Sequence, residues 1–370
     1  MEEFEATVIK NAGSHYLLSR LPQWKPFPAV LRGKVRLQRS TATNPVAVGD
    51  RVRFKPSVAA GCPPEERNTR GCTPEHCHVP GTPYSIAGGP SRRDGGVSPE
   101  GELPQVGIPQ QQENPAIITE ILPRRNYVIR KSTNLSRQAH IIAANLDQAV
   151  IAVSLFFPEI KLPFLDRMLV TCEVYKIPVV IALNKVDLYR SEAPEAVAQF
   201  RRIYEGAGYR VIETSCMTGE GIDKLREACS GRLSLFSGES GVGKSSLIHA
   251  IDPSLDPKIG QISFAHLQGK HTTSLYEMYP ISGPSPMPTG YLIDSPGLRG
   301  FGLVELEKEE IAKYFPEMLR ASEGCRFTPC THTHEPGCAV KAAVEEGTIS
   351  AERYNSYLGM LEDDGKFRKG

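Results

Sequence analysis

The chain has 370 residues, which is more than one typical hydrophobic core organises, so about two or three domains are expected. Its 43 Lys and Arg nearly cancel its 42 Asp and Glu, and the net charge of +1 excludes a protein that binds polyanions over its whole surface. An acidic start, nine cysteines and apolar runs shorter than a bilayer span predict a cytoplasmic protein with reduced thiols and no membrane contact.

The first part of the chain has the alternating, β-branched pattern of short strands. This pattern covers residues 5–9, 16–18, 29–37 and 50–54, and it returns at 116–122 and 127–130. The stretch between, 57–114, is crowded with Pro, Gly, Ser and Gln and is predicted to be a flexible insertion. Residues 1–56 also hold ten Lys and Arg against four Asp and Glu. We therefore expect one small OB-type barrel whose basic face suits nucleic acid.

From about residue 145 the pattern alternates between strand and helix, which predicts an α/β doubly wound domain. The expected strands are continuous apolar runs, as in strands buried on both faces, at 148–154, 178–183, 209–213, 233–236 and 291–293. Helices are expected between them at 162–175, 192–206, 222–229 and 244–250. Beyond residue 303 a Cys- and His-rich stretch precedes helices at 338–346 and 350–361.

A phosphate-binding loop follows the strand predicted at 233–236. It reads Gly238-Glu239-Ser240-Gly241-Val242-Gly243-Lys244-Ser245, with Ser246 continuing into the next helix. Its glycines let backbone N–H groups turn toward a phosphate, and the helix N-terminus adds partial positive charge. Lys244 is expected to reach the β- and γ-phosphates and the Ser245 hydroxyl to bind Mg²⁺. The complete motif in this context disfavours the alternative, a glycine-rich turn without a ligand.

A second phosphate element is expected at the end of the strand at 291–293. In Asp294-Ser295-Pro296-Gly297, the carboxylate can hold Mg²⁺ through water and the Gly297 N–H can meet a γ-phosphate. Leu298 stands where Ras-like enzymes carry a glutamine that orients the attacking water. An apolar side chain cannot do this, so another group must position the water, or a partner must assist hydrolysis.

Gly269-Lys270-His271-Thr272-Thr273 lies between these two phosphate elements. Thr273 is the first candidate, and Thr272 the second, to complete the Mg²⁺ shell. His271 is a candidate catalytic residue that orients or deprotonates water, because imidazole titrates near neutrality. The alternative for His271 is a solvated loop residue or a partner contact.

Asn184-Lys185-Val186-Asp187 ends the strand predicted at 178–183 and supplies guanine chemistry. The Asp187 carboxylate can accept hydrogen bonds from N1–H and the exocyclic amine of guanine, so an ATPase is disfavoured. Asn184 can bond N7 and brace the phosphate loop, while the Lys185 stem can lie across the base. Ser215 and Cys216 follow the strand at 209–213, and the Cys216 N–H can meet guanine O6.

The order of these elements is reversed relative to an ordinary GTPase, which runs from phosphate loop to base-reading loop. Here the base-reading tetrapeptide at 184–187 precedes the phosphate loop at 238–245. Each element stands at a strand end, so a circular permutation explains the order better than chance matches. Permutation is physically permissible because domain termini are often close and surface loops tolerate cutting.

Three cysteines and a histidine lie within fourteen residues near the C-terminus: Cys325, Cys330, His332 and Cys338. Three thiolates and one imidazole form a closed tetrahedral set, which suits structural Zn²⁺. His334 is a spare for His332, and free thiols are the alternative. A second group, at Cys62, Cys72, His76, Cys77 and His78, has no regular spacing, and a mobile loop is its simpler interpretation.

Together these motifs resemble one family, the circularly permuted, small-subunit-dependent GTPase RsgA, also called YjeQ. The resemblance covers nearly the whole chain except 57–114. It implies an N-terminal OB domain (1–135), a permuted P-loop GTPase domain (136–302) and a helical zinc domain (303–370). It also implies weak intrinsic GTP hydrolysis, stimulated by the small ribosomal subunit during its late maturation, and a role for His271 in hydrolysis.

The implied partners are the small subunit with its 16S rRNA, and the ligands are GTP, GDP, Mg²⁺ and one structural Zn²⁺. We expect a monomer. Basic strands, with Tyr16 and Phe54, are expected to contact rRNA. The alternative from a different class is an RNA-binding assembly module with a regulatory nucleotide site and little hydrolysis.

Overall fold

A computed structural model describes residues 3–31, 45–56, 114–131, 139–255, 276–283, 285–295 and 306–362 of the chain. The predicted insertion at 57–114, apart from its last residue, lies outside these ranges, and so does its Cys/His group.

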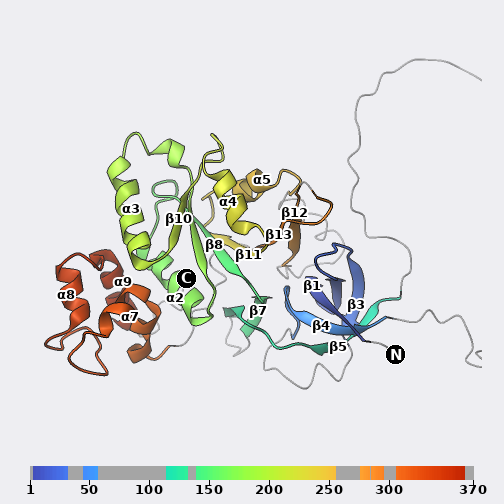
Figure 1. Ribbon diagram of the computed structural model, residues 1–370, viewed down its shortest axis with the longest axis horizontal. Coiled ribbons are helices and arrows are strands. Elements are labelled where there is room, and N and C mark those ends of the chain that lie inside the picture. The colour runs from blue at the N-terminus through green and yellow to red at the C-terminus, as the bar shows by residue number, and fades with distance from the viewer. Residues whose placement is uncertain are drawn as a thin grey trace, which may run out of the picture. The chain divides into compact units, whose positions relative to one another are not determined.

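The N-terminal strands close into a barrel (Figure 1). Its strands are β1 (Phe4–Ala12), β2 (His15–Ser19), β3 (Phe27–Leu31), β4 (Arg51–Lys55) and β5 (Ala116–Ile121), joined in the order β1-β2-β3-β5-β4. Alternate residues point inward, so that Val8, Leu18 and Val52 are fully buried. The small barrel predicted from the strand pattern is confirmed.

The strand predicted at 127–130 is not part of that barrel. It forms β6 (Tyr127–Lys131), which pairs antiparallel with β7 (Ala139–Ala144) in a separate two-stranded sheet. The sequence pattern did not indicate β7. The pair spans the expected domain boundary at 135–136.

The two aromatic residues expected to contact rRNA belong to the barrel core instead. Tyr16 and Phe54 are 4% and 6% exposed and pack among its inward-facing side chains. That expectation was wrong, because both residues lie on the inward face of the alternation. Part of the basic excess on β4 is also neutralised: Arg51 pairs with Glu5 and Arg53 with Glu120, each at 2.8 Å.

The central sheet has six strands in the order β10-β9-β8-β11-β13-β12. Its parallel strands are β8 (Gln148–Val153), β9 (Val179–Leu183), β10 (Arg210–Glu213), β11 (Leu233–Gly238) and β13 (Gly290–Asp294). The sixth, β12 (Met278–Ile281), runs antiparallel at one edge and was not predicted. The predicted α/β class is confirmed.

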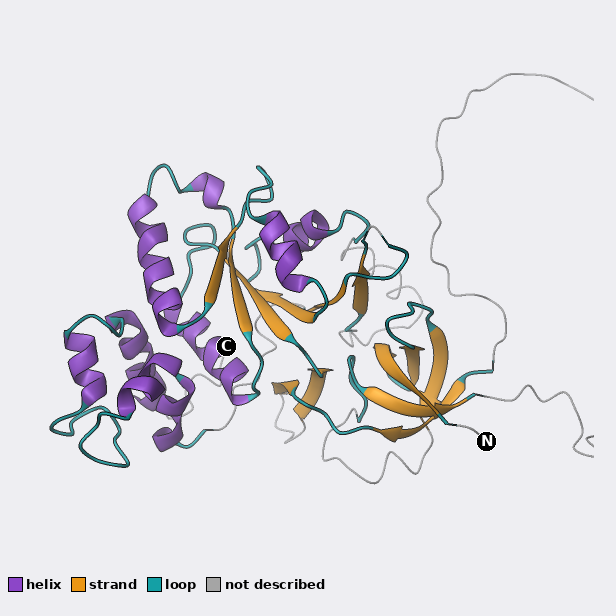
Figure 2. Cartoon of the chain, viewed as in Figure 1, coloured by secondary structure: helices purple, strands orange, loops and turns teal. Residues whose placement is uncertain are grey.

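Helices cover both faces of this sheet (Figure 2). On one face α2 (Leu162–Val174) and α3 (Pro194–Ala207) pack against side chains such as Ile151 and Ile181. On the other, α4 (Ile222–Cys229) and α5 (Lys244–Ile251) pack against side chains such as Val150 and Val180. Neighbouring residues of one strand thus enter opposite cores, which is why its sequence is apolar throughout.

The C-terminal part consists of short helices around the cysteines and packs against α2. It contains the 3₁₀ helix η3 (Lys308–Tyr314), α7 (Pro316–Ser322), α8 (Ala339–Glu345) and α9 (Ala351–Glu362). Arg353 of α9 is 1% exposed and reaches Asp166 of α2 and Glu317 of α7, each at 2.8 Å. Buried charged hydrogen bonds therefore join this part to the central domain.

The barrel contacts the β12 edge of the central sheet. Lys10 Nζ lies 2.8 Å from Glu277 Oε2, just before β12. The Trp24 ring stacks on Tyr291 of β13 with centroids 5.8 Å apart. The strand that ends at Asp294 is therefore in contact with the barrel.

Candidate nucleotide site and metal cluster

The predicted nucleotide loops meet at one edge of the central sheet. Parallel strands have their carboxyl ends at the same edge, where ligands bind in open α/β sheets. The register places Leu183 beside Val153 and Glu213, and it places Phe236 beside Asp294. The loops after β9, β10, β11 and β13 therefore start side by side, although they are far apart in sequence.

The phosphate loop connects β11 to α5 with two glycines in the left-handed region. Gly241 has φ +87° and Gly243 has φ +91°, conformations that cost other residues free energy. Gly238, at the end of β11, has no room for a side chain, because a Cβ there would lie 2.7 Å from the Ala152 carbonyl oxygen. The loop thus has the conformation that presents backbone N–H groups to a phosphate.

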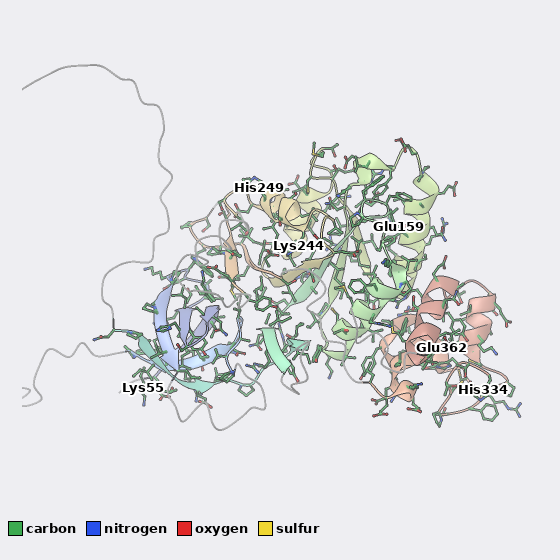
Figure 3. The ribbon with its side chains drawn as sticks, turned by 180° about the vertical axis from the view of Figure 1, so that it is seen from behind. Lys55, Glu159, Lys244, His249, His334 and Glu362 are labelled. Carbon is green, nitrogen blue, oxygen red and sulfur yellow. The ribbon has the colours of Figure 1, made fainter. Side chains whose placement is uncertain are left out.

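Lys244 and Asp294 lie together beside this loop (Figure 3 labels Lys244). The ammonium of Lys244 pairs with the Asp294 carboxylate and donates to the Ser295 carbonyl oxygen at 2.5 Å. Burial raises the pKa of the Asp294 carboxyl, and the charge of Lys244 opposes that rise. A divalent cation would further favour the ionised carboxylate, and the Ser245 hydroxyl stands in the first turn of the adjacent α5. The donor set fits Mg²⁺, which prefers oxygen ligands.

The base-reading tetrapeptide is bonded directly to the phosphate loop. Asn184 Nδ2 donates to the Val242 carbonyl oxygen at 2.9 Å, and Lys185 Nζ donates to that of Gly241 at 2.6 Å. Lys185 takes a left-handed conformation with φ 64° that turns the chain toward the loop. Two motifs more than fifty residues apart therefore form one surface.

Asp187 is exposed in the 3₁₀ turn η1 (Val186–Leu188). Its carboxylate forms no hydrogen bond or ion pair with another described residue, so both oxygens remain available to a ligand. On the other side of Asn184, Thr214 Oγ1 donates to Asn184 Oδ1 at 3.2 Å, and Cys216 Sγ lies 3.8 Å from the same oxygen. The loop after β10 therefore fixes the orientation of the Asn184 amide.

The four residues expected to bind zinc converge in the C-terminal part. Their ligand atoms, from Cys325, Cys330, His332 and Cys338, all lie within 4.8 Å of one another. A tetrahedral Zn²⁺ bound by thiolates about 2.3 Å away would space two sulfurs about 3.8 Å apart. Cys325 Sγ and Cys338 Sγ are 3.9 Å apart, and His332 Nδ1 is 3.4 Å from Cys338 Sγ. The cluster has the size and donor set of a closed zinc site.

The comparisons with known proteins agree with this geometry. The model of the RsgA GTPase family matches residues 121–304. The protein named small ribosomal subunit biogenesis GTPase RsgA from Bacteroides fragilis is 41% identical over 363 residues, with 98% of each chain covered. The protein of that name from Porphyromonas gingivalis is 39% identical over 364 residues, with the same coverage. This chain belongs to the RsgA GTPase family.

Solved structures show the same fold as this RsgA-family chain. YjeQ from Thermotoga maritima is 26% identical, with a TM-score of 0.68 and 98% of each chain covered. YloQ, described as a circularly permuted GTPase, gives a TM-score of 0.63 at 22% identity, over 100% of this chain and 97% of that one. The circular permutation expected from the order of the motifs is confirmed. In the part of the chain that is described, no helix is long and apolar enough to cross a membrane.

Several residues that the RsgA motifs name lie outside the described residues. These are His271, Thr272, Thr273, Gly297 and Leu298. Conversely, sequence reasoning missed two groups that touch the base-reading tetrapeptide. The Phe157 carbonyl oxygen accepts from Lys185 Nζ at 2.5 Å, and Tyr189 OH donates to the Asn184 carbonyl oxygen at 2.6 Å. The Phe157 contact could not be predicted from a motif, because every residue type has a backbone carbonyl group.

Gly243→Ala is expected to weaken nucleotide binding by at least about tenfold, since left-handed strain alone costs roughly 1–2 kcal/mol. A Cβ at this position would also lie 2.5 Å from Asn184 Nδ2, which displaces the amide that holds the two loops together. Calorimetric titration with GDP measures the change. Gly206→Ala is the control, because no atom outside its own helix backbone lies within 4 Å of its Cβ position, so this variant should bind as the parent does. Equal affinity of the Gly243 variant and the parent would show that the two loops tolerate separation.

Proposed function

We propose that this chain hydrolyses GTP to GDP and phosphate during late maturation of the small ribosomal subunit. The observation that supports this most strongly is the bonding of Asn184 and Lys185 to the carbonyl groups of Val242 and Gly241. A nucleotide whose guanine is bound by Asp187 would therefore have its phosphates at the phosphate loop. The ribosomal step is supported by the name of the relatives, small ribosomal subunit biogenesis GTPase RsgA.

Within this site we propose that Lys244 stabilises charge that develops on the γ-phosphate, as preorganised cations do in phosphoryl transfer. Its ammonium is already held beside Asp294. Ser245, Asp294 and Thr273 would hold Mg²⁺, which supplies charge neutralisation of the phosphates when bound. Gly297 would meet the γ-phosphate, and the Cys216 N–H would meet guanine O6.

The experiment that tests this proposal compares GTP turnover of the parent and Lys244→Ala in the presence of Mg²⁺. Turnover is expected to fall at least about a hundredfold when the charge at Lys244 is removed. Binding of GTP with no turnover by either protein would instead indicate an RNA-binding module whose nucleotide site only regulates it.

His271→Ala is expected to lower hydrolysis stimulated by the small subunit about a hundredfold or more while leaving GTP affinity intact. The physical reason is the loss of a group that orients or deprotonates water. The chain offers His249→Ala as a control, since His249 is exposed in the last turn of α5. Equal stimulated rates for the His271 variant and the parent would remove His271 from the mechanism.

We further propose that the barrel and the C-terminal part contact the small subunit and its 16S rRNA, with the protein acting as a cytoplasmic monomer. The barrel is linked to the central sheet by the contacts of Lys10 with Glu277 and of Trp24 with Tyr291. Tyr291 lies in the strand that ends at Asp294, so displacement of the barrel by RNA would reach the nucleotide site. This offers a physical route for stimulation by the subunit.

One structural Zn²⁺ is proposed in the cluster of Cys325, Cys330, His332 and Cys338. Cys338→Ser is expected to abolish stoichiometric zinc, measured by elemental analysis of purified protein, and to loosen α8 and α9, because structural zinc contributes folding free energy. Cys172→Ser is the matched control, since Cys172 is buried in α2 away from the cluster. Retention of one zinc per chain by the Cys338 variant would contradict the assignment.

A further inference from the structure

The connection between β8 and α2 lies beside the nucleotide loops, yet none of the recognised motifs includes it. It comprises residues 154–161, within which Glu159 is labelled in Figure 3. The Phe157 carbonyl oxygen accepts the Lys185 ammonium at 2.5 Å, and the same ammonium donates to Gly241 at 2.6 Å. One lysine therefore ties this connection to the phosphate loop.

A second path runs from this connection to Asn184. The Phe156 ring meets the Tyr189 ring edge-on, with centroids 5.5 Å apart and an interplanar angle of 74°. Tyr189 is 2% exposed, and its hydroxyl donates to the Asn184 carbonyl oxygen at 2.6 Å. Burial raises the pKa of Tyr189, so the phenol remains a protonated donor at neutral pH. Asn184 in turn donates to Val242.

The connection is held in a closed turn by contacts among its own residues. The Phe157 N–H donates to Ser154 Oγ at 3.4 Å, the Ile160 N–H donates to the Leu155 carbonyl oxygen at 3.2 Å, and Phe156 forms a bridge with Glu159. The turn fixes where Phe156 and Phe157 stand relative to the base-reading tetrapeptide.

Both phenylalanines are nevertheless exposed, at 41% for Phe156 and 61% for Phe157. The Phe156 ring contacts Tyr189, which bonds Asn184, and the Phe157 carbonyl oxygen contacts Lys185. Both paths therefore end at the tetrapeptide that reads the base.

We propose that the connection at 154–161 is a positioning element for guanine recognition, with Phe156 acting through Tyr189 on Asn184 and the Phe157 carbonyl acting on Lys185. The proposal rests on the proposed function, since it assigns these residues to the same GTP site. Asn184 is the residue expected to meet guanine N7, whereas Asp187 meets N1–H and the exocyclic amine. Among the contacts with the base, loosening Asn184 should therefore weaken the one with N7 and leave those of Asp187 unchanged.

The test uses two analogues that separate these contacts: 7-deaza-GTP lacks N7, and ITP lacks the exocyclic amine. Equilibrium binding of each is measured by calorimetry for the parent, Phe156→Ala, Tyr189→Phe and Phe164→Ala. The parent should bind GTP about fivefold more tightly than 7-deaza-GTP, the usual effect of one net hydrogen bond. Tyr189→Phe removes only a hydroxyl, so it keeps the test valid if Phe156→Ala folds poorly.

In Phe156→Ala and Tyr189→Phe the preference for GTP over 7-deaza-GTP should fall below about twofold, while the preference for GTP over ITP stays at the parent value. Phe164, 38% exposed on α2, belongs to neither path, and Phe164→Ala should keep both preferences. The proposal is overturned if the parent does not distinguish 7-deaza-GTP from GTP, or if both variants keep that preference. A parent that binds ATP as well as GTP would instead refute the proposed function itself.

Discussion

Asp187→Asn is expected to lower GTP affinity about a hundredfold, since two hydrogen bonds to a charged group are lost at roughly 1.5 kcal/mol or more each. It should raise affinity for xanthosine triphosphate, whose C2 carbonyl can accept from the new amide. The exposed Asp187 carboxylate has no competing partner among the described residues, so the substitution changes ligand chemistry and leaves the fold unaffected.

Competition binding of GTP and xanthosine triphosphate measures this exchange of preference. Asp223→Asn is the matched control, because Asp223 lies on α4 with its side chain 94% exposed and pairs only with Arg226 among the described residues. That variant should keep the parent's preference for GTP. An Asp187 variant that still prefers GTP would show that another group reads the base.

Arg353→Met is expected to lower the free energy of opening of α9 by about 3–5 kcal/mol, as when one partner of a buried ion pair is removed. The substitution leaves Asp166 and Glu317 buried without their cation. The guanidinium also lies 4.6 Å from the centroid of Phe315, so its flat faces pack as well as its hydrogen bonds. Native-state hydrogen exchange of the α9 amides measures this free energy.

Arg320→Met is the control for this prediction. Arg320 of α7 is exposed and donates at 3.3 Å to the carbonyl oxygens of Gly206 and Ala207 in α3, so it also joins the C-terminal part to the central domain. Its loss should change opening by less than about 1 kcal/mol. The effect at Arg353 should also be largely reversed when Asp166 and Glu317 are replaced by apolar residues together with it. If the Arg320 and Arg353 variants lowered the free energy of α9 opening equally, the buried ion pairs would not be what holds α9 in place.

The central sheet could be predicted from sequence because its strands are buried on both faces. The run at 148–154 became β8 (Gln148–Val153), and the helix predicted at 222–229 is α4 with the same bounds. β12 was missed because it is short, lies at the sheet edge and contains Pro280. β7 was missed because periodicity alone does not distinguish a short apolar strand from a buried helix segment.

The site was predictable in its motifs but not in its supporting contacts. Phosphate and base chemistry sets the spacing of glycine, lysine and carboxylate residues around a nucleotide. This spacing can be recognised directly in residues 184–187 and 238–245. Arg353 is buried only because α2 and α7 bring acids to it from distant parts of the chain, which no local pattern encodes. The contact of Phe157 with Lys185 is made by a backbone carbonyl group, so it could not be predicted from residue type either.

The most direct test of the whole account is GTP turnover measured with and without purified small ribosomal subunits, with large subunits as a control. We expect slow turnover by the protein alone, because Leu298 cannot orient water, and a clear increase with small subunits only. Lys244→Ala should abolish turnover under both conditions. Turnover that is the same with and without small subunits, or that survives Lys244→Ala, would contradict the account.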